Sequence, residues 1–312
     1  MSATTQTLPQ LDGTVFLTDG GLETDLIFND GVELPEFAAF VLLSDDAGIT
    51  ALRSYYARFT KIAADHGMGF ILESPTWRSS PDWGEVLGYN REALIAANTR
   101  AIELMIQLRD ELADAAGPIV ISGCIGPRGD GYVADSAMSA AEASTYHHVQ
   151  VDAFTAARAD MVTAITMTNV EEATGIATAA AEAGIPCAIS FTVETDGRLP
   201  DGTPLLDAIA HVDEHAASPP AYFMVNCAHP DHFAATLDPD AAATNRIHGV
   251  RANASRLSHE ELDAAEDLDD GNPEELAAQY AELRERFPQI NVLGGCCGTD
   301  ARHIAAIADA CA

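Results

Sequence analysis

Residues 290–299 have the sequence INVLGGCCGT, and this stretch is the starting point for interpreting the fold. The apolar run 290–293 is typical of a buried strand, and the pattern over 300–310 is typical of a helix. Glycines on both sides of the two cysteines predict a bent loop, because glycine relaxes the backbone and leaves space beside it. The stretch is therefore interpreted as one β–loop–α unit with two thiols in its loop.

Seven similar units precede this one along the chain. Short apolar runs predict strands at residues 14–18, 69–73, 119–122, 161–165, 186–191, 222–226 and 247–252. Helical patterns follow at residues 45–66, 90–115, 139–159, 170–183, 204–216, 230–237 and 273–287. Eight strands that alternate with helices imply a parallel sheet. We expect one domain over residues 1–312 with an α/β fold, a (β/α)8 TIM barrel; a doubly wound open sheet is the competing architecture.

In such a barrel the chemistry lies at the C-terminal ends of the strands. Many polar or reactive residues of this chain fall at those ends. They are Asp19, Gly20, Glu73, Cys124, Thr166, Glu194, Cys227, Asn253, Cys296 and Cys297. Their convergence favours the barrel over the open sheet.

The composition excludes several classes of partner. The chain has 48 acidic and 16 basic residues and a formal net charge of −32, so nucleic acid and anionic membranes are not expected to bind. No apolar run approaches the ~20 residues of a membrane span, and residues 1–11 do not resemble a signal peptide. We expect a cytoplasmic protein, whose six cysteines serve as metal ligands, reactive thiols or buried side chains rather than disulfides.

A third cysteine is expected beside the pair at 296–297. Cys227 follows the sixth strand and the pair follows the eighth, which in a barrel are about two strand spacings, or ~10 Å, apart. Side chains that reach inward from both strands can meet at one point. Three thiolates suit zinc, and a three-ligand site leaves one position for a substrate. Cys187 and Cys311 are interpreted as small buried residues, and Cys124 is expected on the far side of the ring.

The chain resembles the homocysteine S-methyltransferase family, zinc barrels that methylate a thiol. The shared motifs are residues 19–24, 125–127 with Gly131, Tyr132 and Asp135, 190–193, 201–205, 226–227 and 294–299. The Gly-Gly-Cys-Cys-Gly-Thr motif, with Asn-Cys about 70 residues earlier, is the most specific of them. The resemblance implies that Cys227, Cys296 and Cys297 bind Zn²⁺, with no further catalytic residue needed.

The resemblance also implies methyl transfer to a small-molecule thiol, most simply homocysteine giving methionine. A thiol is a good nucleophile only as thiolate, and zinc promotes its ionisation near neutral pH. The family's donors are S-methylmethionine, betaine or methylfolate, and a small methyl-onium donor is favoured here. Trp77 matches an aromatic position of the family and is a candidate contact for that cation, although packing at the barrel mouth explains it equally well. Asp19 and Gly20 are candidate acceptor contacts.

The family pattern breaks after the fourth strand. The family carries there a Phe-Glu-Thr-type stretch whose glutamate binds the amino group of the acceptor, and Ile165 occupies the matching position. Isoleucine cannot pair with an ammonium group, a loss of ~1.5–3 kcal/mol. Either Glu73 or Glu194 supplies the carboxylate from another strand, or the acceptor is not homocysteine.

Two other functions fit the same cysteines. One is a vicinal-dithiol redox protein in which Cys227 resolves the pair, and the other is a non-catalytic zinc barrel that binds a methylated onium compound. His229 and His248 are candidate fourth ligands or structural histidines. His147 is predicted on the surface, the glycine-rich segment 123–131 as a turn at the barrel mouth, and the acidic segment 263–275 as a solvated loop. The oligomeric state is left open.

Overall fold

The computed structural model describes residues 8–112, 117–134, 138–265 and 267–312. Within these residues, eight parallel strands close into a barrel in sequence order. They are β1 (Phe16–Leu17), β2 (Gly69–Glu73), β3 (Ile119–Ile125), β4 (Met161–Met167), β5 (Cys187–Phe191), β6 (Tyr222–Asn226), β7 (Ile247–Ala252) and β8 (Val292–Gly295). The ring closes where Leu17 of β1 pairs with Leu293 of β8. The (β/α)8 barrel is therefore confirmed, and the open sheet is wrong.

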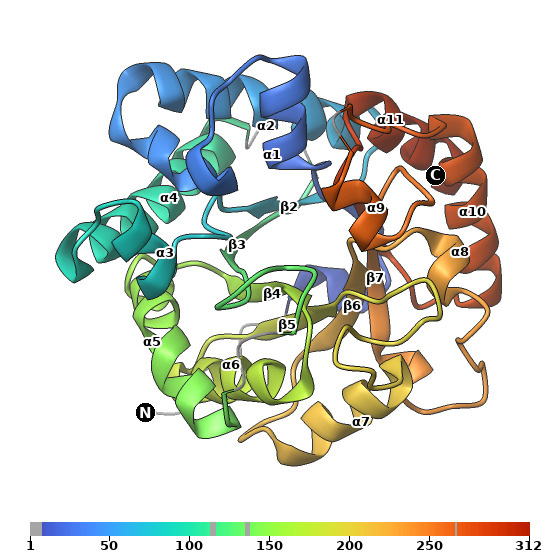
Figure 1. Ribbon diagram of the computed structural model, residues 1–312. Helices are drawn as coiled ribbons and strands as arrows, with labels where there is room; N and C mark the ends of the chain where they lie inside the picture. The colour runs from blue at the N-terminus through green and yellow to red at the C-terminus, as the bar shows by residue number, and fades with distance from the viewer. Residues whose placement is uncertain (1–7, 113–116, 135–137, 266) are drawn as a thin grey trace.

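Helices surround the strands (Figure 1). The long ones are α2 (Asp46–Asp65), α4 (Arg91–Leu112), α5 (Ala140–Ala156), α6 (Val170–Ala183), α7 (Leu205–His215), α10 (Pro273–Arg286) and α11 (Ala301–Cys311). The short ones are α1 (Leu22–Thr24), α3 (Pro81–Val86), α8 (Pro230–Phe233) and α9 (His259–Asp263). Side chains of Asp45, Ser139 and Asn169 accept hydrogen bonds from first-turn backbone N–H groups, which explains where α2, α5 and α6 begin.

One end of the barrel interior is filled. Apolar side chains from early strand positions pack there, and Leu8 joins them from the N-terminal segment. The Asn291 amide donates to the backbone oxygen of Gln10 at 2.6 Å, and the Gln10 amide donates to the Tyr222 hydroxyl at 3.3 Å. These contacts close the N-terminal end of the barrel, so the opposite end is left for a cavity.

Most differences from the sequence prediction are small. Strands β3 and β4 extend to Ile125 and Met167, so Cys124 lies within a strand. Three short helices, α1, α3 and α9, were not predicted. The surface placement of His147 is wrong, because its side chain is fully buried and its Nε2 lies 2.9 Å from a carboxylate oxygen of Glu172.

Three predictions fall partly or wholly outside the described residues: Asp135, the last residues of the helix expected over 90–115, and residue 266 of the acidic segment 263–275. Among the residues that the structure describes, no helix is long and apolar enough to cross a membrane.

Candidate active site and metal centre

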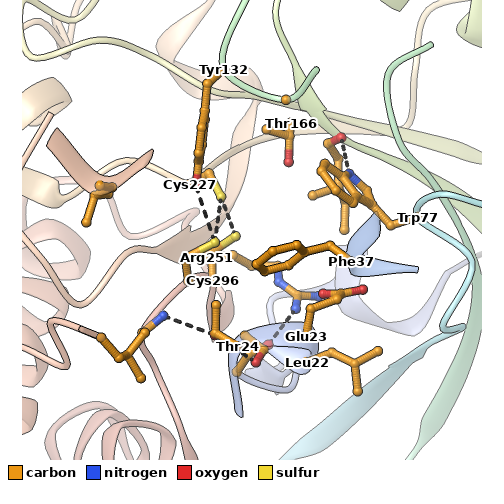
Figure 2. Close-up of a pocket in the computed structure, with 18 of the residues that line it drawn as sticks. Leu22, Glu23, Thr24, Phe37, Trp77, Tyr132, Thr166, Cys227, Arg251 and Cys296 are labelled. Carbon is orange, nitrogen blue, oxygen red and sulfur yellow. Dashed lines mark hydrogen bonds between the residues drawn. The ribbon is translucent and has the colours of Figure 1, made fainter. Parts of the chain in front are cut away.

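A cavity of about 410 Å³ opens at the C-terminal ends of the strands. Its wall contains residues that end or follow β1, β2, β4, β6, β7 and β8, together with residues of β3 and of the segment 262–269. Figure 2 shows Cys227 and Cys296 at its centre, with Tyr132 on one side and Trp77 on another. The cavity therefore lies where a TIM barrel normally carries its chemistry.

The three family-motif cysteines meet in this cavity. Cys227 follows β6 in a left-handed backbone conformation (φ 53°), and Cys296 and Cys297 follow β8. The sulfur of Cys227 lies 2.6 Å from that of Cys296 and 3.6 Å from that of Cys297. All three cysteines are free, and their sulfurs lie within 4.8 Å of one another.

Close backbone packing around the pair explains the glycines beside it. A Cβ atom on Gly21 would lie 2.5 Å from the backbone oxygen of Cys296, and one on Gly294 would lie 1.8 Å from the Thr18 hydroxyl. Both distances are shorter than real side-chain contacts. Only glycine at these two positions allows the end of β1 to press against the loop after β8, which fixes the direction of the thiols.

The Asn226 side chain holds the end of β6. Its oxygen accepts from the Thr166 backbone N–H at 2.9 Å and from the Ser190 hydroxyl at 2.6 Å. Its amide donates to the Thr166 hydroxyl at 2.8 Å and points at the Cys296 sulfur from 3.8 Å. This residue thus ties three strands together directly before Cys227.

Proximity makes the three thiols electronically unequal. Hydrogen bonds from Cys227 and Cys297 lower the pKa of Cys296 well below its usual value, and the Arg251 charge acts in the same direction. The same hydrogen bond to Cys296 raises the pKa of Cys227. One sulfur of the cluster is therefore disposed to be a thiolate.

The donor set fits a soft divalent metal. Zinc binds thiolates at ~2.3 Å in tetrahedral geometry, which places ligand sulfurs ~3.8 Å apart. The 3.6 Å between Cys227 and Cys297 is close to that value, and the 2.6 Å between Cys227 and Cys296 is shorter. Three sulfurs on two strand ends, facing a cavity, leave one coordination position toward a ligand.

A polar wall supports the cysteines from one side. The Tyr132 hydroxyl donates to the Cys297 sulfur at 3.4 Å, and burial raises the pKa of Tyr132, so the hydroxyl keeps its proton. The Tyr132 ring stacks on His259 of α9 at 4.3 Å. Nε2 of His259 lies 2.7 Å from the backbone oxygen of Cys227, and its Nδ1 lies 3.0 Å from Glu194. Helix α9 is thereby fastened to the cysteine cluster.

A buried ion pair lies in the cavity wall beside the thiols. Nη2 of Arg251, on β7, donates to Asp19 at 2.6 Å and to the backbone oxygen of Gly20 at 3.2 Å. Tyr55 donates a second hydrogen bond to Asp19 at 3.1 Å. Burial raises the pKa of Asp19, and the Arg251 charge opposes that rise. Nη1 of Arg251 is buried and has no hydrogen-bond partner among the described residues.

Two further carboxyls of the cavity resist ionisation. Burial raises the pKa of Glu73 from 4.5 to about 7, against the opposing charge of Arg251. Burial likewise raises the pKa of Glu23 to about 7. Oε2 of Glu73 is buried with no hydrogen-bond partner among the described residues. The residue itself lines the cavity. Oε2 of Glu73 can therefore accept a hydrogen bond from a ligand, or donate one when the carboxyl is protonated.

The family model for homocysteine S-methyltransferases matches residues 16–311, almost the whole chain. The chain belongs to the homocysteine S-methyltransferase family. A homocysteine S-methyltransferase of Escherichia coli (strain K12) is 28% identical over 227 residues, which cover 67% of this chain and 69% of that protein. As a member of this family, the chain is a methyltransferase.

Solved structures of the homocysteine methyltransferase MmuM from Escherichia coli share the fold. The oxidised form matches with a TM-score of 0.75 and 22% identity, covering 94% of each chain. The metallated form matches with a TM-score of 0.72 and 22% identity, covering 95% of this chain and 96% of the other.

The structure separates the predicted substrate contacts of this family member into two groups. Asp19, Gly20, Glu73 and Trp77 line the cavity. Glu194 does not line the cavity, and its carboxylate contacts His259. Glu194 is therefore poorly placed to replace the family glutamate. Ile165 lines the cavity and is 6% exposed, so the position of that glutamate is apolar here.

The histidines considered as fourth ligands lie elsewhere. His229 begins α8 and accepts from the Asp231 backbone N–H at 3.3 Å, and His248 packs against Tyr222. Neither lines the cavity. Cys124 lines the cavity from β3, as expected for a residue near the end of that strand, and it is not part of the three-sulfur cluster; burial raises its pKa well above the usual value.

The sequence reasoning missed Arg251, Tyr132 as a thiol contact, and His259. Arg251 carried a visible signal: a charged residue near the C-terminal end of an otherwise apolar barrel strand points into the barrel mouth. His259 carried none, because its role depends on how the segment after β7 folds back over the cavity.

Proposed function

We propose that this family member is a zinc-dependent S-methyltransferase. It moves a methyl group from a small onium donor to a thiol, most simply homocysteine giving methionine. The observation that carries the proposal is the meeting of three free cysteine sulfurs, within 4.8 Å of one another, in the cavity at the C-terminal end of the barrel. All three cysteines belong to family motifs, and two of them, Cys296 and Cys297, lie in the loop after β8.

Cys227, Cys296 and Cys297 would hold the zinc. When bound, zinc supplies a position for the acceptor sulfur and lowers the pKa of that thiol. The chain's own residues keep the three ligands in place: Asn226 fixes the end of β6, and Tyr132 donates to the Cys297 sulfur.

For the acceptor, Glu73 is the proposed replacement for the carboxylate that Ile165 lacks. Glu73 lines the cavity, and its Oε2 has no hydrogen-bond partner among the residues that the structure describes. Glu73 also lies near enough to Arg251 for their charges to interact. An acceptor ammonium beside Glu73 would favour the ionised carboxylate, because an opposite charge stabilises it. A thiol without an amino group is the alternative acceptor, and Ile165 is equally compatible with it.

For the donor, a small cation fits the charge of the site better than a neutral pterin. Three thiolates around one divalent metal carry a net negative charge, and the Trp77 ring lies in the cavity wall. Both features favour an onium group, since aromatic faces and anions attract cations.

The test uses zinc-loaded protein and a thiol screen against sulfonium and ammonium donors. We expect methyl transfer to homocysteine, with kcat/KM about 10- to 100-fold higher than for 4-mercaptobutyrate, which lacks the amino group. Glu73→Gln should remove this preference, and Glu92→Gln, at an exposed position of α4, should keep it. Equal rates on both thiols in the wild type would refute the role of Glu73.

The redox alternative makes a different prediction. A dithiol centre would retain no zinc after purification under reducing conditions and would oxidise reversibly within the cluster. One zinc per chain together with methyl transfer excludes both this alternative and a non-catalytic onium-binding barrel.

A further inference from the structure

Arg78 is held in an unusual way at the rim of the cavity. It lies five residues beyond the end of β2, in the loop that leads to α3. Its guanidinium lies 3.8 Å from the ring centre of Trp83 and 4.9 Å from that of Trp77. Stacking on two indoles fixes the plane of the guanidinium, so that its N–H donors point in defined directions.

Arg78 has no anionic partner in the part of the chain that the structure describes. Two arginines among the described residues line the cavity, and Arg251 is paired with Asp19. No carboxylate of the described residues forms an ion pair with Arg78, and its Nε is buried without a hydrogen bond. Burial lowers the pKa of Arg78, and the more distant Asp130 acts against that effect. An unpaired guanidinium facing a cavity is suited to an anionic ligand group.

The position of Arg78 separates it from the acceptor. Arg251 and Glu73 lie on strand ends, and the Arg251 charge acts directly on Cys296. Arg78 lies on a loop beyond the end of β2. The charges that act most on its pKa are those of Asp130, Glu23, Glu36 and Tyr132, and not those of the cluster cysteines. An acceptor anchored by its sulfur at the cysteines lies near the strand ends, whereas Arg78 lies on that loop, so Arg78 is available to the second substrate.

We propose that Arg78 binds the carboxylate of the methyl donor and thereby selects onium carboxylates over onium ions that carry no acid. The inference rests on the proposed function, because it concerns the donor of that reaction. In the transfer, a lone pair of the acceptor sulfur forms the new C–S bond while the bond between methyl and the onium atom breaks. The electron pair of the broken bond stays on the donor atom, which leaves neutral.

The charges explain the selectivity. A donor without a carboxylate would bring a second positive charge next to an unpaired guanidinium, which is repulsive. A donor with a carboxylate brings an anion to Arg78 and directs its cationic end toward the negative cysteine cluster. In-line attack requires the leaving atom on the far side of the methyl from the acceptor sulfur, and the inference places the donor's carboxylate beyond that atom, at Arg78.

The test compares 3-(dimethylsulfonio)propionate with dimethylpropylsulfonium, which lacks only the acid, in zinc-loaded wild type and Arg78→Met. For the wild type we expect kcat/KM to favour the carboxylate donor by about 10- to 100-fold, the value of one charged hydrogen bond. Arg78→Met should lose this preference by reacting more slowly with the first donor while reacting at least as fast with the second. Arg78→Lys should retain part of it.

Arg128→Met is the matched control. Its guanidinium also stacks on an aromatic ring, at 4.8 Å from Tyr146, but it lies outside the cavity wall and pairs with Asp82. This variant should keep the donor preference, and all variants should keep one zinc per chain as proof of folding. An equal loss by Arg78→Met on both donors, or no loss on either, overturns the inference.

Failure of the proposed function gives a different result. In that case the wild type transfers no methyl group from either donor to any thiol. Calorimetric titration of the two sulfonium compounds then still tests Arg78, because binding does not require transfer. Tighter binding of the carboxylate compound, abolished by Arg78→Met, supports the inference, and equal affinities of the wild type for both compounds refute it.

Discussion

Glu73 offers a direct physical test of the cavity. It is 5% exposed, and burial raises its pKa from 4.5 to about 7. Between these two pH values the unfolded chain ionises this carboxyl and the folded protein does not. The free energy of unfolding of the wild type therefore falls as pH rises from 4.5 to 7, by about 3 kcal/mol in total at ~1.4 kcal/mol per pKa unit. Above pH 7 this contribution stays constant.

The assay is urea unfolding of wild type and Glu73→Gln at a series of pH values and constant salt. The amide cannot ionise, so the difference between the two proteins should change by about 3 kcal/mol in favour of the variant between pH 4.5 and 7. The raised pKa of Glu23 affects both proteins equally and cancels. Parallel curves over this range would refute the argument that Glu73 is buried without its charge.

Glu142→Gln is a control of opposite sign. Glu142 is exposed in the first turn of α5, and hydrogen bonds from the backbone and hydroxyl of Ser139 lower its pKa. A lowered pKa stabilises the fold above the unfolded value of 4.5, and this contribution is lost as pH falls further. The difference between wild type and this variant should therefore change below pH 4.5 and not between 4.5 and 7.

Three further results are expected. Alanine at any one of the three cluster cysteines should reduce bound zinc well below one per chain by elemental analysis, whereas Cys311→Ala, remote from the site, should leave it unchanged. Arg251→Met should lower the free energy of unfolding by about 3–5 kcal/mol, because it leaves Asp19 as an unpaired buried charge. The double variant with Asp19→Asn should recover much of that loss of stability, and no recovery would contradict the role of the ion pair. Tyr132→Phe should weaken zinc binding about tenfold in chelator competition, because the hydrogen bond to Cys297 is lost. Unchanged zinc affinity would show that this hydrogen bond does not support the ligand.

The barrel was predictable because its signals are local. Each strand is a short apolar run, and the strands at 69–73, 222–226 and 247–252 begin and end where the sequence pattern predicted. The meeting of Cys227 with the pair at 296–297 followed from topology, since parallel strand ends share one rim. Local pattern and fold geometry together were enough to place these three side chains.

The remaining features depend on contacts between distant segments. His147 looked like a surface residue because its helix pattern is weak, but α5 packs on α6 and buries it against Glu172. Arg251 meets Asp19 across 232 positions of sequence. The stacking of His259 on Tyr132 requires both loops to fold over the same cavity. No periodicity in a single sequence encodes such pairs.

The charge balance of the cavity explains how an acid-rich chain can carry out this chemistry. The protein has a net charge of −32, and several acidic residues line the cavity that holds the thiols, among them the buried carboxyls of Asp19, Glu23 and Glu73. If all three were ionised and unpaired, they would repel a thiolate acceptor. Arg251 neutralises the first, and burial keeps a large fraction of the other two protonated near neutral pH. Neutralising these three carboxyls leaves more of the negative charge near them on the cysteine sulfurs, which the proposed cationic methyl donor would approach.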